Sequence, residues 1–253
     1  MYGQYSEEFR PELDIDPPAR QRRLTVLLRA LLLIPHFIVL IAAGIVTFFA
    51  AIFAWFGALA LGRLPRWAAD YLGGYLRYAT GVYASFYLLI DSYPPFSFSG
   101  APDFPVRVEL RPTELNRLAV LLRIILVIPA AILSGVISAG WSALAFFCWL
   151  VVLILGRNPA GLFESTAAIV RYQLRTDAYF LMLTPAYPKG LFGDAGTRDA
   201  GEAVSATHPL RVGTGGKVLL VIFIVVGLAS SISSDAYSSS DNSGASYSSP
   251  ASL

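Results

Sequence analysis

The sequence predicts an all-α integral membrane protein made of two tandem repeats, each a transmembrane helical hairpin followed by an interfacial amphipathic helix. A short extended strand precedes each repeat, and one extra C-terminal transmembrane helix follows the second. Composition supports a membrane protein, because the chain is 55% hydrophobic and only 14% charged, whereas a soluble domain is about 25% charged. Two long stretches without any charge, 30–62 and 124–156, supply the apolar segments.

An internal duplication supports the two-repeat architecture. Arg23 to Pro94 aligns without a gap on Arg117 to Pro188, at an offset of 94 residues, and 25 of the 72 aligned positions are identical. A sequence that repeats itself over such a length is expected to form the same structural unit twice.

The repeats and their flanking segments divide the chain into seven parts. Pro11 to Pro18, Pro105 to Pro112 and Pro209 to Val212 are extended segments between or after prolines, and alternating Val and charged residues in the second are typical of a strand. Pairing of these segments would give a small sheet at the membrane surface. The parts are 1–22, an N-terminal polar segment with a short strand; 23–97, the first membrane repeat; 98–112, a linker and strand; 113–190, the second repeat; 191–216, a loop with a short strand; 217–234, a C-terminal transmembrane helix; and 235–253, a disordered Ser-rich tail.

Each long apolar stretch favours a hairpin over one span. A single helix over 30–62 would be about 50 Å long, while the hydrocarbon layer is about 30 Å thick. In the first repeat the hairpin would run out over 24–43 and back over 46–61. In the second, small residues mark the turn: Ser134, Gly135, Ser138, Ala139 and Gly140. The alternative is one surface helix followed by one span, with Pro35 and Pro129 at the bend.

Charge gives the expected orientation. Arginines flank each apolar stretch at both ends, with Arg23 before and Arg63 after the first, and Arg117 before and Arg157 after the second. Arginines near helix ends prefer the cytoplasmic side, and a hairpin puts both groups there. The prediction is therefore five spans in the bacterial inner membrane with a cytoplasmic N-terminus.

A second helix follows each Gly-Arg-x-Pro corner, over 67–90 and 162–183. Each is apolar but carries charges, and the first is crowded with tyrosines, which favour the membrane interface. Both are predicted to lie in the cytoplasmic interface, with a re-entrant or fully inserted helix as the alternative.

Three sequence blocks, RLTVLLRALLLIPHFIVL, LGRLPRW and LLIDSYPPFSF, resemble domain-of-unknown-function family 4389, a bacterial membrane domain. The family's runs LLAIPH, GRYPRGLFDF, VLRW and DRYPPF correspond to Leu32–His36, Gly62–Trp67, Tyr75–Tyr78 and Asp91–Phe96. The second copy carries Val127–Pro129, Gly156–Phe163, Ile169–Tyr172 and Ala186–Pro188, but it lacks the His after the proline and has Pro185 where Asp91 stands. The resemblance implies a prokaryotic membrane protein and brings no agreed activity, substrate or cofactor.

Polar residues in the apolar stretches give no catalytic signature, so no catalytic residue, metal site or cofactor is predicted. His36 aligns with Ala130 of the other copy, so the histidine is not duplicated, which favours a packed histidine over a symmetric site. The matched acids Asp70 and Glu164 are better explained as complements of a helix dipole than as an acid–base pair.

Duplicated arginines are the best candidates for binding, because guanidinium groups at the interface bind the phosphates of anionic headgroups. The candidate headgroup-binding residues are Arg63, Arg77, Arg157 and Arg171 with Tyr78 and Tyr172. The competing explanation is that these arginines only set topology by snorkelling.

The function predicted from the sequence is that of a non-enzymatic multi-pass membrane protein, acting as a scaffold or accessory subunit of a membrane complex. The alternative is an anionic-lipid or small-molecule binding or transport protein. Expected partners are membrane lipids and other membrane proteins. Nucleic acid is not an expected partner, because the net charge is only +2.

Overall fold

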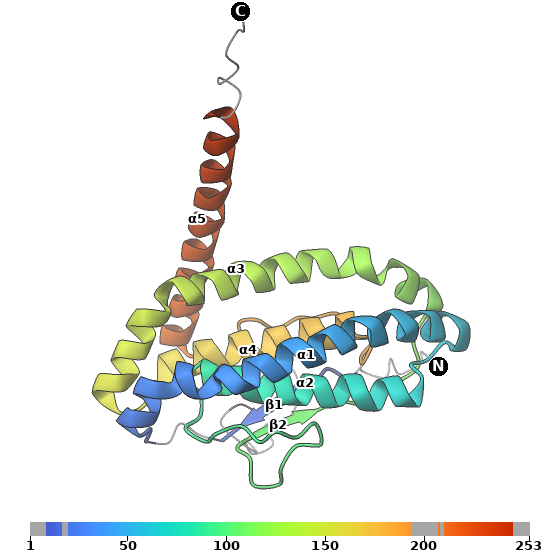
Figure 1. Cartoon of the computed structure of the whole chain (residues 1–253), viewed down its shortest axis with the longest axis horizontal. Coiled ribbons are helices and arrows are strands. Elements are labelled where there is room, and N and C mark those ends of the chain that lie inside the picture. The colour runs from blue at the N-terminus through green and yellow to red at the C-terminus, as the bar shows by residue number, and fades with distance from the viewer. Residues whose placement is uncertain (1–8, 17–19, 194–206, 208–209, 245–253) are drawn as a thin grey trace, which may run out of the picture.

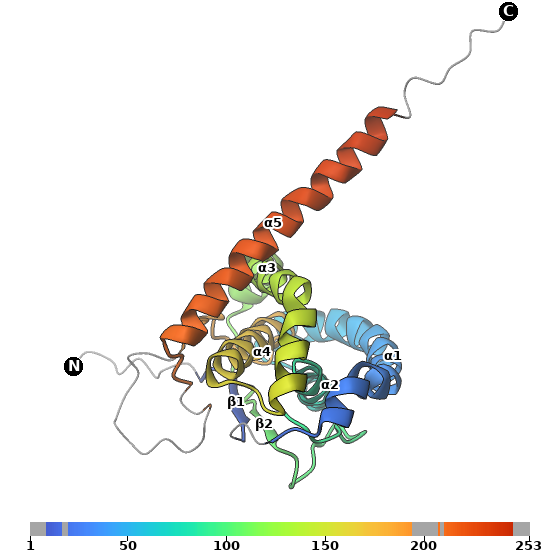
Figure 2. The ribbon, with the colours of Figure 1, turned by 90° about the vertical axis from the view of Figure 1, so that its left-hand side faces the viewer.

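A computed structural model describes residues 9–16, 20–193, 207 and 210–244, with side chains up to residue 232. The elements in chain order are β1 (Glu12–Ile15), α1 (Arg23–Leu61), α2 (Arg66–Phe86), β2 (Val106–Glu109), α3 (Arg117–Leu155), α4 (Ala160–Phe180) and α5 (Thr214–Gly244). Helices α2 and α4 lie side by side, flanked by α1 and α3, and the two strands lie below them (Figures 1 and 2).

The predicted hairpins are wrong, because α1 and α3 are each one continuous helix of 39 residues. The small residues of 134–140 do not interrupt α3, and Pro35 and Pro129 lie inside helices, where proline bends the chain without ending it. Each helix ends only at a glycine with positive φ, Gly62 (69°) and Gly156 (63°), as expected for a helix C-cap.

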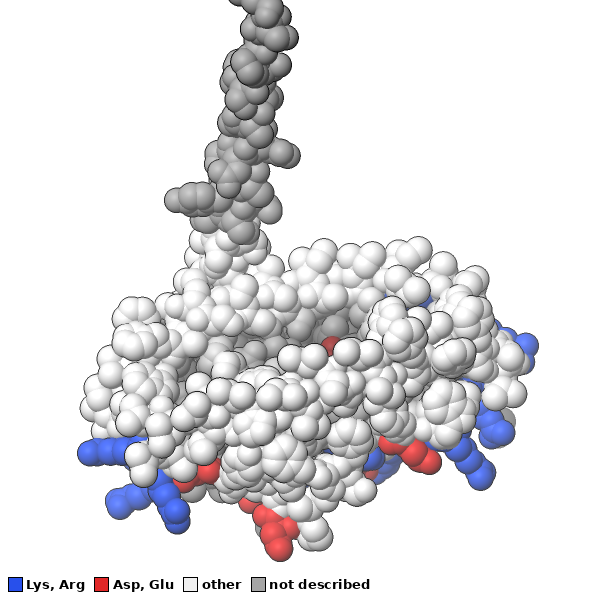
Figure 3. Space-filling view, in the orientation of Figure 1, with Lys and Arg blue, Asp and Glu red and all other residues white. Residues whose placement is uncertain are grey.

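Three helices, α1, α3 and the 214–232 part of α5, are long and apolar enough to cross a membrane. This indicates a membrane protein, in which the described residues hold three candidate spans in place of the predicted five. The charged side chains gather along the lower edge and at the two ends of the body, and the face over α3 is uncharged (Figure 3). The arched helix α3 turns both of its ends toward that edge (Figure 1). The bend thus puts both ends of the apolar stretch on one side, as the predicted turn was expected to do.

The second helix of each repeat is not an exposed amphipathic helix in this fold, because α2 and α4 are mostly buried. Glycines let the 98–104 segment pack closely on α2: a Cβ on Gly74 or Gly81 would lie 3.0 Å from Phe98 or Phe104. The Tyr71 hydroxyl donates inward to the carbonyl of Ala43 at 3.1 Å. Tyr71 therefore makes an internal hydrogen bond, and the placement of α2 and α4 at a membrane interface stays a prediction.

The two repeats hold each other through reciprocal contacts. The indole of Trp55 donates to the carbonyl of Val120 at 3.0 Å, and the indole of Trp149 donates to the carbonyl of Val26 at 2.9 Å. Each of these positions differs from its counterpart by the offset of the repeat. Main-chain bonds follow the same rule, from Gln21 N to Gly156 O and from Leu115 N to Gly62 O, both at 2.9 Å.

Each repeat therefore makes on the other the same contacts that it receives from it. Such reciprocity is the pattern of a two-fold axis. Helices α1 and α3 run antiparallel across it, so that the start of each lies beside the end of the other (Figure 1).

The predicted sheet forms from two of the three extended segments. Strands β1 and β2 pair antiparallel, with Leu13 opposite Val108. The third segment, described from Leu210, is not a strand. Leu210 and Val212 are buried, and Thr207 approaches β1 through its hydroxyl, which accepts from Ile15 N at 2.7 Å. A side-chain bond at this place replaces the expected third strand.

Helix α5 crosses α3 at two glycines. A Cβ on Gly140 would lie 1.7 Å from the carbonyl oxygen of Phe223, and one on Gly227 would lie 1.9 Å from that of Val136. Small residues permit such close backbone approach between membrane helices. Within the 134–140 stretch, Gly140 therefore serves a helix crossing instead of the predicted turn.

The start and the end of α5 both differ from expectation. The Glu164 carboxylate accepts from Gly213 N at 2.7 Å and so caps the beginning of α5, which gives this acid a helix-terminal role, at a different helix from the predicted one. The helix continues to Gly244, into the Ser-rich tail predicted to be disordered. Residues 245–253 lie outside the described part.

We expect Gly140→Ala to lower the melting temperature of the detergent-purified protein, because its methyl group displaces α5 from α3. Gly135→Ala is the matched control, since its Cβ meets nothing within 4 Å and replacing glycine inside a helix gains about 0.5–1 kcal/mol. The two variants should shift the melting temperature in opposite directions. Equal shifts would contradict the crossing.

Candidate functional site

A hollow of about 490 Å³ opens between α1 and α3 above α2 and α4. We call it the central hollow. Figure 3 shows it as a depression in an otherwise uncharged face, with acidic atoms visible inside. Most of its wall is apolar, and the lining residues include Thr47, Trp55, Ala79, Tyr83, Arg123 and Asp177.

The central hollow exists because the two repeats differ at two positions. In the other half of the molecule, Trp141 stands at the position equivalent to Thr47, and its ring packs on Tyr87 at 4.3 Å between centroids. Gln173 stands at the position equivalent to Ala79 and donates to Tyr87 and Ser138. Large side chains thus fill one half, and Thr47 and Ala79 leave the other half open.

Asp177 gives the central hollow an ionisable group. Its side chain opens onto the hollow, and protein atoms enclose it on the other sides. The equivalent position in the first repeat is Tyr83. This burial raises the pKa of Asp177 to about 7, since removing a carboxylate from bulk water disfavours its charged form. The hollow therefore changes charge near neutral pH.

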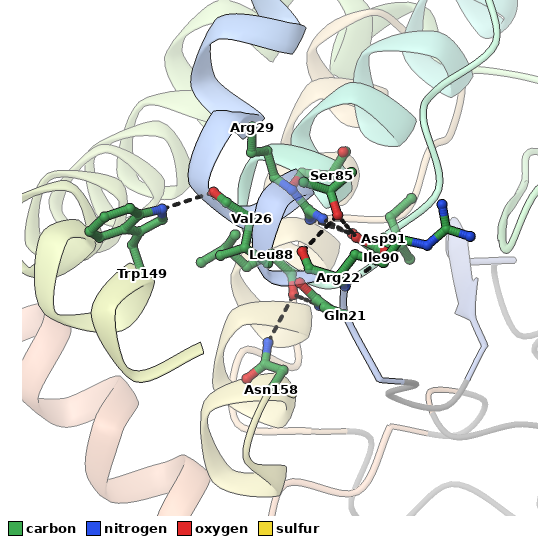
Figure 4. A network of polar contacts seen from close by, with 11 residues as sticks. Gln21, Arg22, Val26, Arg29, Ser85, Leu88, Ile90, Asp91, Trp149 and Asn158 are labelled. Carbon is green, nitrogen blue, oxygen red and sulfur yellow. Dashed lines mark hydrogen bonds and ion pairs between the residues drawn. The ribbon is translucent and has the colours of Figure 1, made fainter. Parts of the chain in front are cut away.

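Arg29 shows how the first repeat satisfies its buried arginine. The guanidinium donates to the carbonyls of Ser85 and Ile90 and forms an ion pair with Asp91 at 2.9 Å (Figure 4). The Asp91 carboxylate also accepts from Thr25 and from Arg22 N. The cation is thereby fully paired.

Arg123, the equivalent residue in the second repeat, lacks this arrangement. It is 2% exposed, donates to the carbonyl of Thr184 at 3.1 Å and lies 4.3 Å from the ring centroid of Tyr179. Pro185 occupies the place of Asp91. The Nε and Nη1 atoms of Arg123 have no hydrogen-bond partner in the described part of the chain. A buried cation with free donors therefore forms part of the wall of the central hollow.

The structure separates the arginines predicted to bind headgroups. Arg63 and Arg157 are exposed at opposite ends of the body, where their main chains form equivalent antiparallel β-bridges, Arg63 with Glu114 and Arg157 with Arg20. Arg171 is buried and donates to the carbonyl of Gly190 at 2.8 Å.

Two other predicted residues do come together. Arg77 and Tyr78 line a second hollow of about 350 Å³ beside β2 and the 94–104 segment. Tyr78 is buried there, while its counterpart Tyr172 lies in the hydrophobic core. Headgroup binding at these six positions stays a prediction.

His36 is a packed histidine, as expected. It is fully buried, its Nδ1 lies 2.7 Å from the Tyr78 hydroxyl, and its ring stacks on Phe96 at 4.0 Å between centroids. Tyr78 is thus engaged by His36 on one side while it lines the second hollow on the other.

The sequence analysis singled out neither Arg123 nor Asp177, although both line the central hollow. The available signal was the alignment of the two repeats at positions where they differ: Thr47 with Trp141, Ala79 with Gln173, and Asp91 with Pro185.

Comparison with known proteins identifies the family. The model for "Domain of unknown function (DUF4389)" matches residues 23–97 and 117–191, which is more than half of the chain. The chain therefore belongs to this family and carries two tandem copies of its domain, as the resemblance implied. No curated protein and no solved structure shows a significant match.

The Arg29–Asp91 pair gives a stability prediction. Asp91→Asn leaves the buried guanidinium without its counter-charge, and breaking a buried pair in this way costs about 3–5 kcal/mol. Asp16→Asn is the matched control, because its pair with Arg107 is exposed and such pairs contribute about 0–1 kcal/mol. Thermal unfolding in detergent should show a much larger loss for Asp91→Asn. Similar losses would show that the buried pair does not stabilise the fold.

Asp177 gives a pH prediction. Its pKa is about 7 in the folded protein against 3.8 for an ordinary aspartate, so the folded state binds more protons between these pH values. Stability then falls as pH rises through that window and levels off above it. We expect Asp177→Asn to remove this fall, so that its melting temperature exceeds the wild-type value more at pH 8 than at pH 5. A difference independent of pH would exclude the raised pKa.

Proposed function

We propose that this member of the DUF4389 family is a non-enzymatic membrane protein that binds an amphiphile with an acyl chain in the central hollow. The observation that carries the proposal is the hollow itself: about 490 Å³, mostly apolar, with Arg123 and Asp177 in its wall. Ligand sites are typically clefts of about 300–1,000 Å³ with apolar walls and a few polar groups.

The outer surface supports placement of α1 and α3 within the membrane. Large apolar side chains are exposed along both helices, among them Ile38, Phe53, Ile125 and Phe147. Patches of this extent mark contact with lipid or protein. We propose that both helices lie in one leaflet, that α5 spans the bilayer, and that the charged edge lies at the cytoplasmic headgroups.

This placement gives a lipid direct access to the site. The central hollow opens on the uncharged face (Figure 3), so an acyl chain in the bilayer enters it without crossing water. The inner-membrane location and the cytoplasmic N-terminus are part of this proposal.

The geometry favours binding over the scaffold or accessory role. A scaffold needs a surface and has no use for an internal hollow made by two small residues, Thr47 and Ala79, at positions where the other repeat has large ones. If the purified protein carries no amphiphile, the scaffold role becomes the better supported function.

Filling the central hollow tests the proposal. The double variant Thr47→Trp with Ala79→Gln copies the filled half of the molecule, and we expect it to lose most of the co-purified amphiphile. Phe49→Trp is the control, because Phe49 is exposed on the outer face. Native mass spectrometry from mild detergent measures retention. An empty wild-type protein, or equal retention by the filled variant, would reject binding at this site.

A further inference from the structure

We infer that Arg123 recognises an anionic head on the amphiphile, a carboxylate or a phosphate. This inference rests on the proposed function and adds the charge class of the ligand. Its starting point is the difference between two equivalent arginines, of which Arg29 is paired with Asp91 and Arg123 has no ion pair among the described residues.

The protein itself does not complete the coordination of Arg123. Thr184 supplies one carbonyl, and Tyr179 supplies the face of its ring and the attraction of its side-chain hydroxyl. Neither provides a partner for Nε or Nη1. In the first repeat the corresponding places are taken by Ile90 and Ser85, and both of their carbonyls accept from Arg29. The second repeat thus keeps one of the two carbonyl contacts and, with Pro185, lacks the carboxylate.

An unpaired buried cation requires a partner from outside the chain. A buried donor without an acceptor costs about 1–3 kcal/mol, and more when it is charged. Arg123 is buried against protein except where it meets the central hollow. Asp177 lines the same hollow but makes no hydrogen bond to the free Nε and Nη1 of Arg123 in the described part of the chain, so the acceptor that reaches these donors is one bound in the hollow. An anion is the acceptor that guanidinium binds best.

The rest of the hollow specifies what accompanies the anion. Phe48, Ile52, Phe56 and Ile124 are apolar lining residues contributed by α1 and α3. Such a wall does not solvate a free inorganic anion, but it does bind a hydrocarbon chain. The ligand class is therefore an anion joined to an acyl chain, supplied by a fatty acid or by an anionic phospholipid.

Restoring the missing carboxylate tests the inference. Pro185→Asp places an acid where Asp91 stands in the first repeat, so that Arg123 acquires the partner that Arg29 has. Pro185→Asn has the same shape without the charge and is the matched control. Arg123→Gln is the second variant, and circular dichroism checks that it folds.

Three probes separate the head from the tail in delipidated protein: oleate, oleyl alcohol and phosphatidylglycerol. We expect the wild type and Pro185→Asn to prefer an anionic probe over oleyl alcohol by about tenfold or more. Pro185→Asp and Arg123→Gln should lose this preference and bind oleyl alcohol as before. Whether oleate or phosphatidylglycerol binds more tightly identifies the head as carboxylate or phosphate.

The outcomes distinguish this inference from the proposal on which it rests. A preference for anions that survives in Pro185→Asp, or that disappears equally in Pro185→Asn, overturns the role of Arg123 and leaves the amphiphile site intact. Failure of all three probes to bind the wild type overturns the site itself.

Discussion

The exchange of hydrogen bonds between α1 and α3 is the constraint on which the rest of the structure depends. Each helix receives an indole from the other near its start, at Val26 and Val120. Each also receives an arginine from the other near its end, at Ile154 and Ala60, where the last carbonyls of a helix lack internal partners and attract cations. The long helices are thereby held antiparallel and apart in their middle, and α2 and α4 occupy the space beneath.

The two repeats make the same contacts at the ends of α1 and α3 but differ in the side chains between them. Substitutions in that central part change the shape of the interior while the contacts at the helix ends keep the fold. Trp141 and Gln173 fill one half, and Thr47 and Ala79 leave the other half open. The same division gives one arginine a carboxylate and leaves the other with free donors.

The sequence predicted the repeat, the helical class and two of the three proposed extended segments of the sheet, because identity, apolar runs and alternating residues report these features locally. It did not predict the course of α1 and α3. Length, the small residues of 134–140 and the flanking arginines all favoured a turn, and the contact of Gly140 with Phe223 shows that this glycine serves α5 instead. The candidate site escaped for a related reason. Arg63 and Arg171 were chosen because they recur, whereas the hollow depends on positions that do not.

Reciprocal closure also orders the events of synthesis. Val26 precedes its partner Trp149 by 123 residues, which a ribosome adding about 5–20 residues per second needs roughly 6–25 s to produce. During that interval the first repeat has been synthesised, but the residues of the second repeat that it contacts have not. Its helices must remain where the second repeat can still reach them, so the time course of translation and the final architecture are coupled in this protein.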